Sequence, residues 1–200
     1  MEVIDFESQV TDKRQAAFVI FYALDGMPWL NYPSDHPGRH ELTIPTCLMI
    51  NRSDGNIGFI GGMIEPGETL LDAATREVEE EIGHTIDLQL EPVVAHDIGP
   101  ITTHAFLSET TYEELRKIQE KAITGVHFGS ELTGVFMPHL IDYTAAIGKG
   151  GGLVNLLKAS MAPSVREEMV HFLLKTEILD KETLEAICHD AGYELVKLLA

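Results

Sequence analysis

The chain has few cysteines and no long apolar run. Only two cysteines occur among its 200 residues, Cys47 and Cys188, and they lie far apart in apolar surroundings. So small a number argues against a disulfide framework, and we expect two buried thiols in a reducing cytosol. No apolar run reaches the roughly 18 residues that a membrane-spanning helix requires, and the acidic first residues lack the basic start of a signal peptide. We therefore expect a cytoplasmic protein without a membrane partner.

Positive charge is also scarce. The 14 lysines and arginines stand against 32 aspartates and glutamates, which gives a formal net charge of −18. Proteins that hold long nucleic acids by their phosphates need clustered cations, so this balance counts against DNA as a partner. It suits a small-molecule enzyme in which metal ions offset the repulsion between carboxylates and an anionic substrate. Since 44% of the residues are hydrophobic, the chain can still bury a core.

Strand and helix signals are mixed through the first two thirds of the chain, and helical signals dominate the rest. Residues 25–40, rich in glycine and proline, indicate a long loop. Pro163-Ser164 followed by Glu167 is typical of a capping box that opens a helix. The expected strands cover residues 14–22, 43–50, 86–97, 101–108 and 132–137, and the expected helices cover residues 69–82, 111–122, 153 onward, 164 onward and 180 to about 199.

One motif carries the chemistry. It reads Gly62-x5-Glu68-x7-Arg76-Glu77-Val78-x-Glu80-Glu81-x-Gly83, without a gap. On a helix, three of its glutamates stand at i, i+3 and i+4, so their carboxylates converge on one face and repel one another. A hard divalent cation, which prefers oxygen ligands, turns that repulsion into binding. Four apolar residues share the adjacent face and are expected to pack on a sheet: Leu71, Ala74, Val78 and Ile82.

Acidic runs such as residues 79–81 are ordinarily solvated helix surface. Here Gly62, Glu68, Arg76 and Gly83 stand in register with them, which favours a metal site. A calcium loop is a poorer explanation, because no EF-hand spacing is present.

Residues 62–84 resemble the Nudix box of the Nudix hydrolases, with His84 in place of a final aliphatic residue. The resemblance implies a single α/β domain over residues 1–200. We expect a Nudix α/β/α sandwich with a mixed central sheet and extra C-terminal helices over about residues 152–200. It also implies that the enzyme hydrolyses a phosphate–phosphate linkage in a nucleotide-like substrate.

The resemblance assigns roles within the box. Two or more Mg²⁺ ions, with Mn²⁺ as the alternative, would be held by four residues: Gly61 through its carbonyl, Glu77, Glu80 and Glu81. Glu68 and Arg76 would form a structural ion pair. Nudix enzymes draw the general base from different places, and the candidates here are Glu81 and Glu131.

Outside the box, residues 13–184 resemble the snoRNA-decapping Nudix hydrolases, which also act as (deoxy)inosine diphosphatases. The resemblance rests on residues 112–115, 129–134, 151–153 and 164–167. It implies a homodimer that hydrolyses purine nucleoside diphosphates and RNA caps.

By position, Arg52 would contact a substrate phosphate and Phe59 would line the nucleotide pocket. His96 and Glu131 would face the metal and phosphates from neighbouring loops. Two positions depart from the pattern: Phe18 replaces a base-contacting histidine and Glu168 replaces a glutamine. The departures therefore concern recognition of hypoxanthine and leave the residues for phosphate and metal unchanged.

Each of these residues also has an ordinary structural interpretation. Phe18 and Phe59 are the kind of aromatics found in cores, Arg52 could be a solvated turn cation, and His96 could be a strand histidine. The glycine-rich residues 148–152 lack the spacing of a phosphate-binding loop.

Three functions remain open. The first is hydrolysis of nucleoside diphosphates or their derivatives to a monophosphate. The second is removal of an RNA 5′ cap or NAD cap at the same site. The third is nucleotide sensing without turnover, which is disfavoured because every glutamate of the box is present.

Overall fold

The computed structural model describes residues 1–4, 6, 13–28, 43–83, 88–141 and 151–200. The strands are β1 (Glu2–Ile4), β2 (Arg14–Pro28), β3 (Thr43–Cys47), β4 (Met49–Arg52), β5 (Ile57–Gly58), β6 (Ile60–Met63), β7 (Glu91–Asp97), β8 (Ile101–Glu109) and β9 (Leu132–Phe136). The helices are α1 (Leu70–Ile82), α2 (Tyr112–Lys121), α3 (Leu153–Lys158), α4 (Val165–Lys175), α5 (Lys181–Ala191) and α6 (Leu195–Leu198), with a 3-10 turn η1 (Ala122–Thr124).

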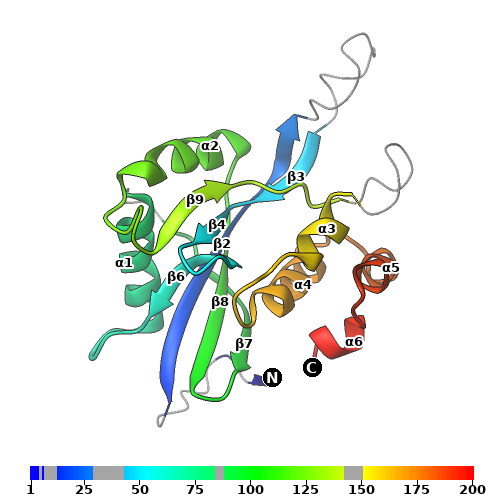
Figure 1. Cartoon of the computed structure of the whole chain (residues 1–200), viewed down its shortest axis with the longest axis horizontal. Coiled ribbons are helices and arrows are strands. Elements are labelled where there is room, and N and C mark those ends of the chain that lie inside the picture. Colours follow the sequence, from blue (N-terminus) through cyan, green and yellow to red (C-terminus); the bar gives the residue numbers. More distant parts are fainter. Residues whose placement is uncertain (5, 7–12, 29–42, 84–87, 142–150) are drawn as a thin grey trace.

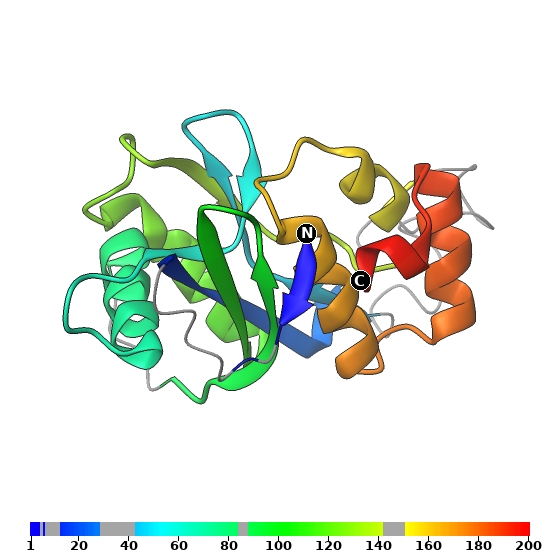
Figure 2. The ribbon, with the colours of Figure 1, turned by 90° about the horizontal axis from the view of Figure 1, so that it is seen from below.

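A six-stranded mixed sheet forms the middle layer, in the order β1-β7-β8-β2-β3 with β6 also paired to β2. Strands β2 and β8 are parallel, and the other pairings within this sheet are antiparallel. Helices α1 and α2 cover one face, and α3 to α6 lie on the other (Figure 1). Figure 2 shows the same three layers from below. The α/β/α sandwich expected from the sequence, with its mixed sheet and additional C-terminal helices, is confirmed. A smaller sheet, β5-β4-β9, flanks it.

Strand β2 is buried on both faces, which explains its nearly continuous apolar sequence. Val19 and Phe21 pack with α1 and α2, whereas Ile20 and Tyr22 pack with the C-terminal helices. Phe18 contacts this second cluster and is only partly buried. Alternation along β2 therefore directs Phe18 toward the layer that contains α4.

Helix α1 begins and ends where its sequence places capping residues. The Thr69 hydroxyl accepts from the Asp72 N–H at 3.1 Å, and the Asp72 carboxylate accepts from the Thr69 N–H at 3.0 Å. The helix ends at Gly83, whose φ of 65° is left-handed. One detail of the prediction is wrong: Leu71 is 52% exposed. The buried face is rotated slightly and is formed by Ala73, Ala74, Val78 and Ile82.

The C-terminal layer differs from the prediction in two places. Ser164 makes no side-chain cap for α4: its φ of 71° is left-handed, whereas capping residues are typically extended, and its hydroxyl donates to Glu168. The predicted capping box with Glu167 is therefore wrong. The last predicted helix is two helices, since Gly192 adopts a φ of 93° and ends α5.

Other boundaries shift by a few residues. The predicted strand 43–50 is divided at Leu48 into β3 and β4, and β2 extends through Pro28 into the predicted loop. The predicted strand 86–97 begins at Glu91. The remainder of the loop, residues 29–42, lies outside the described residues, as do His84 and residues 148–150 of the glycine-rich segment.

Both cysteines are free and buried, as expected. Among the described residues, no helix has the length and apolar character needed to cross a membrane.

We predict that Thr69→Ala lowers the free energy of unfolding by about 1 kcal/mol, because the first turn of α1 loses its cap. Urea denaturation measures the change. Thr75→Ala is the matched control: its hydroxyl donates to the Leu71 carbonyl at 2.8 Å within the helix and caps nothing. Alanine is also the better helix former there, so an equal loss in both variants would contradict the assignment of the cap.

Candidate active site

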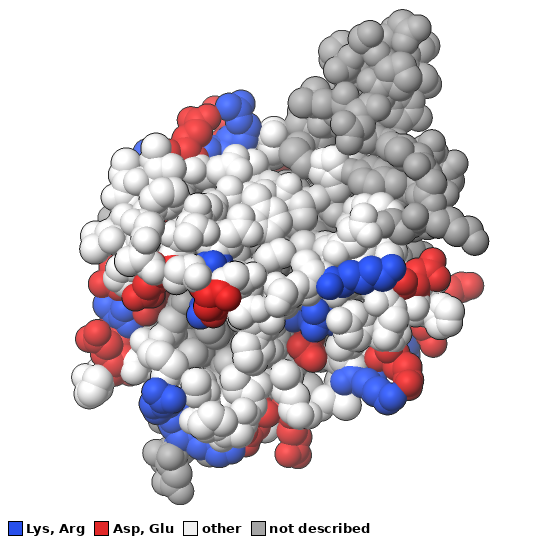
Figure 3. All heavy atoms as spheres, viewed as in Figure 1, with Lys and Arg blue, Asp and Glu red and all other residues white. Residues whose placement is uncertain are grey.

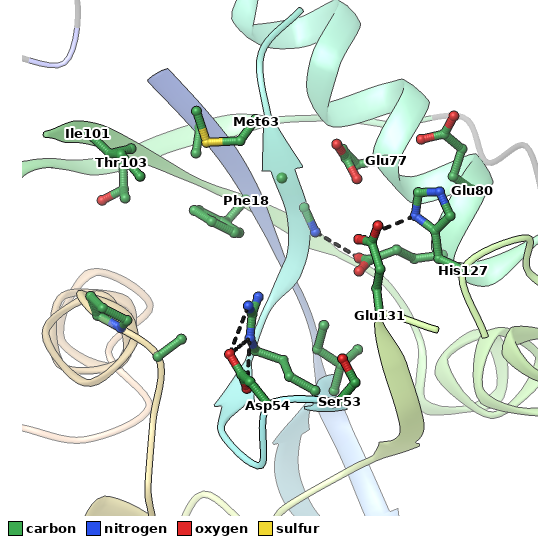
Figure 4. Close-up of a pocket in the computed structure, with 18 of the residues that line it drawn as sticks. Phe18, Ser53, Asp54, Met63, Glu77, Glu80, Ile101, Thr103, His127 and Glu131 are labelled. Carbon is green, nitrogen blue, oxygen red and sulfur yellow. Dashed lines mark hydrogen bonds and ion pairs between the residues drawn. The ribbon is translucent and has the colours of Figure 1, made fainter. Parts of the chain in front are cut away.

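A cleft of about 650 Å³ opens between the central sheet, α1, the β4–β5 turn and the segment that leads into α4. Its two ends differ in character (Figure 4). One end is lined by charged groups: Glu77, Glu80, Glu81, His127 and Glu131. The other end is largely apolar: Phe18, Met63, Ile98, Ile101, Thr103 and Pro163. Arg52 and Asp54 lie on the turn between β4 and β5.

Two glycines of β6 allow neighbouring elements to pack closely against this strand. A Cβ on Gly62 would lie 2.5 Å from a carboxylate oxygen of Glu77, and a Cβ on Gly61 would lie 2.1 Å from the Ala17 carbonyl oxygen. The Gly61 N–H donates to the Glu81 carboxylate at 2.9 Å. Glycine at position 62 therefore lets the Glu77 carboxylate lie directly against the strand, and glycine at position 61 lets β6 pair closely with β2.

Arg76 connects the acidic residues. Its Nε and Nη2 donate to the two oxygens of Glu68 at 2.8 and 3.1 Å, and Nη2 also donates to the Met63 carbonyl at 2.9 Å. Its Nη1 donates to one oxygen of Glu77 and one of Glu80, both at 2.9 Å. The Glu68–Arg76 pair expected from the sequence is present, and the hydrogen bond from Arg76 holds the pKa of Glu68 below its usual value.

The charged end of the cleft favours a cation. Burial raises the pKa of Glu77 and raises that of Glu81 to about 8, and the negative charge of Glu77 contributes to the second shift. A nearby positive charge would lower the free-energy cost of ionising both carboxyl groups.

The donor atoms fit a divalent ion. Arg76 takes only one oxygen of Glu77 and one of Glu80, so the other oxygens are free of hydrogen bonds to the described residues. Ligand atoms of Glu77, Glu80 and His127 all lie within 4.8 Å of one another. Glu81 is not in this group of three, and one of its carboxylate oxygens accepts from the Gly61 N–H. Of the four expected metal ligands, the structure thus brings Glu77 and Glu80 together, with Glu81 and Gly61 beside them.

A sequence profile of the Nudt16-like family, described as U8 snoRNA-decapping enzyme-like, matches residues 15–179. The chain belongs to this family of Nudix hydrolases. It is therefore a Nudix diphosphohydrolase, and the cleft that holds the box glutamates is its candidate active site.

Individual relatives agree with this assignment. The U8 snoRNA-decapping enzyme of Mus musculus is 27% identical over 178 residues, which cover 84% of this chain and 85% of that protein. The one of Homalodisca vitripennis is 32% identical over 110 residues, which cover 52% of this chain and 58% of that protein. The second match thus spans little more than half of its relative.

Solved structures establish the fold. A mutT/nudix family protein from Listeria innocua has a TM-score of 0.51 and 18% identity, over 82% of this chain and 94% of that one. A C. elegans Ap4A hydrolase binary complex has a TM-score of 0.51 and 14% identity, over 83% of this chain and 99% of that one. Such low identities support the Nudix sandwich and nothing finer.

Besides the box glutamates, three predicted substrate or catalytic residues lie in the cleft. Phe18 lines its apolar end. Arg52 lies at the rim, where Nε and Nη2 donate to an oxygen of Asp54 at 3.1 and 3.0 Å. Glu131 enters from the segment before β9, with its side chain 65% exposed.

Three other predicted residues do not line the cleft. Phe59 is only 1% exposed and packs in the core that includes the C-terminal helices, so the expectation that it lines the nucleotide pocket is wrong. His96 lies on β7 and is buried against the ring of His171 on α4, with ring centroids 5.7 Å apart. Its predicted contact with metal and phosphates is therefore also wrong, and burial lowers its pKa to about 4.

Glu168 lies behind the apolar end of the cleft, not in its wall. It is completely buried on α4 and accepts from the Ser164 hydroxyl at 2.8 Å. Ser164 in turn accepts from the Thr103 hydroxyl at 3.2 Å, and Thr103 does line the cleft. Burial raises the pKa of Glu168 to about 7. The predicted direct contact with substrate is thus replaced by an indirect connection through two hydroxyls.

His127 is the residue that sequence analysis missed. It lies between η1 and β9 and faces Glu80 and Glu131 (Figure 4). Its only local signal is the spacing of four residues to Glu131. Nothing in the sequence indicates that this segment folds back onto α1.

We predict that Glu168→Gln stabilises the protein more at pH 8 than at pH 5. Burial raises the folded-state pKa of this acid from 4.5 to about 7. The stability linked to its protonation is thus fully present below pH 4.5 and is lost as the pH rises through about 7. Glutamine stays neutral, so the difference in unfolding free energy between variant and parent should rise by about 1–3 kcal/mol across this window.

Urea denaturation of both proteins at pH 5 and pH 8 measures this difference. The buried histidines His96 and His171, whose pKa values are lowered, titrate in both proteins and cancel in the comparison. A difference that does not change with pH would show that Glu168 is ionised in the folded protein.

Proposed function

We propose that this Nudix hydrolase cleaves the diphosphate linkage of nucleoside diphosphates or their derivatives and releases a nucleoside monophosphate. It would use Mg²⁺ or Mn²⁺, with two or more ions per site. The observation that carries the proposal is the cleft itself. Free oxygens of Glu77 and Glu80 stand at one end, an apolar subsite lies at the other, and Arg52 is at the rim.

The two ends of the cleft suit the two parts of a nucleotide. Phe18 offers a partly exposed aromatic ring to a base, and the Thr103 hydroxyl is the polar group beside it. Asp54 binds one edge of the Arg52 guanidinium, through Nε and Nη2. The remaining N–H donors of Arg52 can reach a phosphate. A nucleotide would therefore lie with its base against β2 and its phosphates toward α1.

Glu77 and Glu80 would hold the metal, and a bound divalent ion supplies charge neutralisation and makes an attacking water more acidic. The chain offers two groups to accept the proton of that water. Glu81 is buried beside the metal ligands and is oriented by the Gly61 N–H. Glu131 is exposed and lines the same end of the cleft. Comparing Glu81→Gln with Glu131→Gln distinguishes them. Substitution of the true base should lower kcat without a matching change in KM.

Removal of an RNA cap is the second candidate. The resemblance to proteins described as U8 snoRNA-decapping enzymes supports it. The charge of the chain counts against an extended RNA surface, since the net charge is −18. On the face seen in Figure 3, cations also stand among carboxylates and form no continuous patch. A cap without a long tract of RNA is the form of substrate that agrees with both observations.

We also propose that the protein is cytoplasmic and forms a homodimer, as the resemblance implies. Light scattering should then give a mass near twice 22.1 kDa. A mass of one chain would contradict the dimer and leave the proposed reaction unaffected.

Turnover in ¹⁸O-labelled water, followed by mass spectrometry with Mg²⁺ or Mn²⁺, tests the reaction. The substrates are IDP, GDP, ADP-ribose, NADH, a cap analogue and capped RNA. We expect labelled phosphate-containing products and a loss of at least about 100-fold in Glu80→Gln, since even outer partners of a metal ion contribute 10–100-fold.

Glu79→Gln is the matched control, because it removes the same charge from the exposed side of the same helix. It should retain parental activity. A folded protein that binds Mn²⁺ but turns over none of the substrates would favour the nucleotide-sensing alternative.

A further inference from the structure

We propose that the divalent ion of this site has a nitrogen ligand, the imidazole of His127, beside the carboxylates of Glu77 and Glu80. The inference rests on the proposed function only in requiring an ion at the acidic end of the cleft. It adds a ligand from outside the Nudix box and thereby a preference among ions.

The distances fit a single ion. Ligand atoms of Glu77, Glu80 and His127 lie within 4.8 Å of one another. An ion with bonds of about 2.1 Å places opposite ligands about 4.2 Å apart, so a small movement of these side chains is enough. Arg76 holds one oxygen of each glutamate and leaves the other for the ion.

The environment of the ring matches that of a metal-binding histidine. Nδ1 of His127 is buried without a hydrogen bond, and the nearest carboxylate oxygen, from Glu131, is 3.6 Å away. Histidines that bind a metal through one nitrogen usually donate from the other nitrogen to a carboxylate. If Nδ1 donates to Glu131, then Nε2 is the free ligand atom. Figure 4 shows the ring between Glu80 and Glu131, as this arrangement requires.

The backbone fixes the position of His127 against α1. Its N–H donates to the Glu80 carbonyl at 3.4 Å. A Cβ on Gly125 would lie 2.3 Å from the Glu81 carbonyl oxygen, so only glycine lets this segment approach so closely. The His127 carbonyl accepts from the N–H groups of Ser130 and Glu131 at 3.1 and 3.0 Å. These contacts hold the imidazole beside the box glutamates, although His127 lies far from them in the sequence.

An imidazole ligand changes which ion the site prefers. Mg²⁺ favours oxygen donors and keeps its waters, whereas Mn²⁺ and the later first-row ions accept nitrogen more readily. We therefore expect His127 to strengthen binding of Mn²⁺ more than binding of Mg²⁺.

Pulsed electron paramagnetic resonance of the full-length protein loaded with Mn²⁺ tests the proposal directly. The parent should show modulation from a directly coordinated imidazole ¹⁴N, and His127→Gln should lack it. Calorimetry should show that His127→Gln weakens Mn²⁺ binding about tenfold or more and Mg²⁺ binding less. His189→Gln is the control, because His189 is exposed on α5 and does not line the cleft.

Each result separates the inference from the proposed function. Imidazole modulation that persists in His127→Gln, or that is absent from the Mn²⁺-loaded parent, overturns the ligand assignment while turnover by the same preparation leaves the hydrolase intact. Failure of the parent to bind Mn²⁺ overturns both. Glu131→Gln should retain the nitrogen signal with weaker binding, as expected for a positioning residue.

Discussion

The site depends on keeping several carboxylates in a confined space beside a sheet. Glu77 and Glu81 are buried, and Glu80 adjoins them. The N–H donors of the Arg76 guanidinium compensate part of this negative charge. They donate to Glu68, Glu77, Glu80 and the Met63 carbonyl. Lysine could not replace it, because a single ammonium cannot donate in that fork geometry. Arg76 still leaves one oxygen of Glu77 and one of Glu80 unused, so the charge is only partly compensated. The incomplete compensation is what would favour a cation in the cleft.

Formation of the site also requires that its backbone segments approach one another closely. The Glu77 carboxylate reaches β6 only because Gly62 has no side chain, and the segment before β9 reaches α1 only because of Gly125. Gly61 allows β6 itself to lie close against β2. The three glycines thus bring together a helix, two strands and a distant segment. Without these contacts the glutamates of α1 would project into solvent, as Glu79 does. The same box could then carry charge without forming a site.

The sequence predicts what is local and periodic. Helix α1 is predicted well because its apolar spacing lies within the helix and its capping residues, Thr69 and Gly83, directly flank it. The predicted roles of Phe59, between β5 and β6, and of His96, on β7, fail because the direction of each side chain depends on how the strands pair with distant partners. Ser164 fails as a cap because its left-handed φ is not encoded in the residue type. His127 is missed because its role arises from packing between segments that are far apart in sequence.

The charge of the cleft also affects how an ion and a substrate would bind together. An anionic substrate approaching Glu77, Glu80 and Glu131 is repelled, and Arg52 is partly neutralised by Asp54. A divalent ion and the substrate phosphates would therefore favour each other's binding, because each would reduce the electrostatic cost of the other. Such coupling is reciprocal: the factor by which an ion tightens substrate binding equals the factor by which the substrate tightens ion binding. A site that repels its substrate alone would in this way select the substrate together with a metal ion.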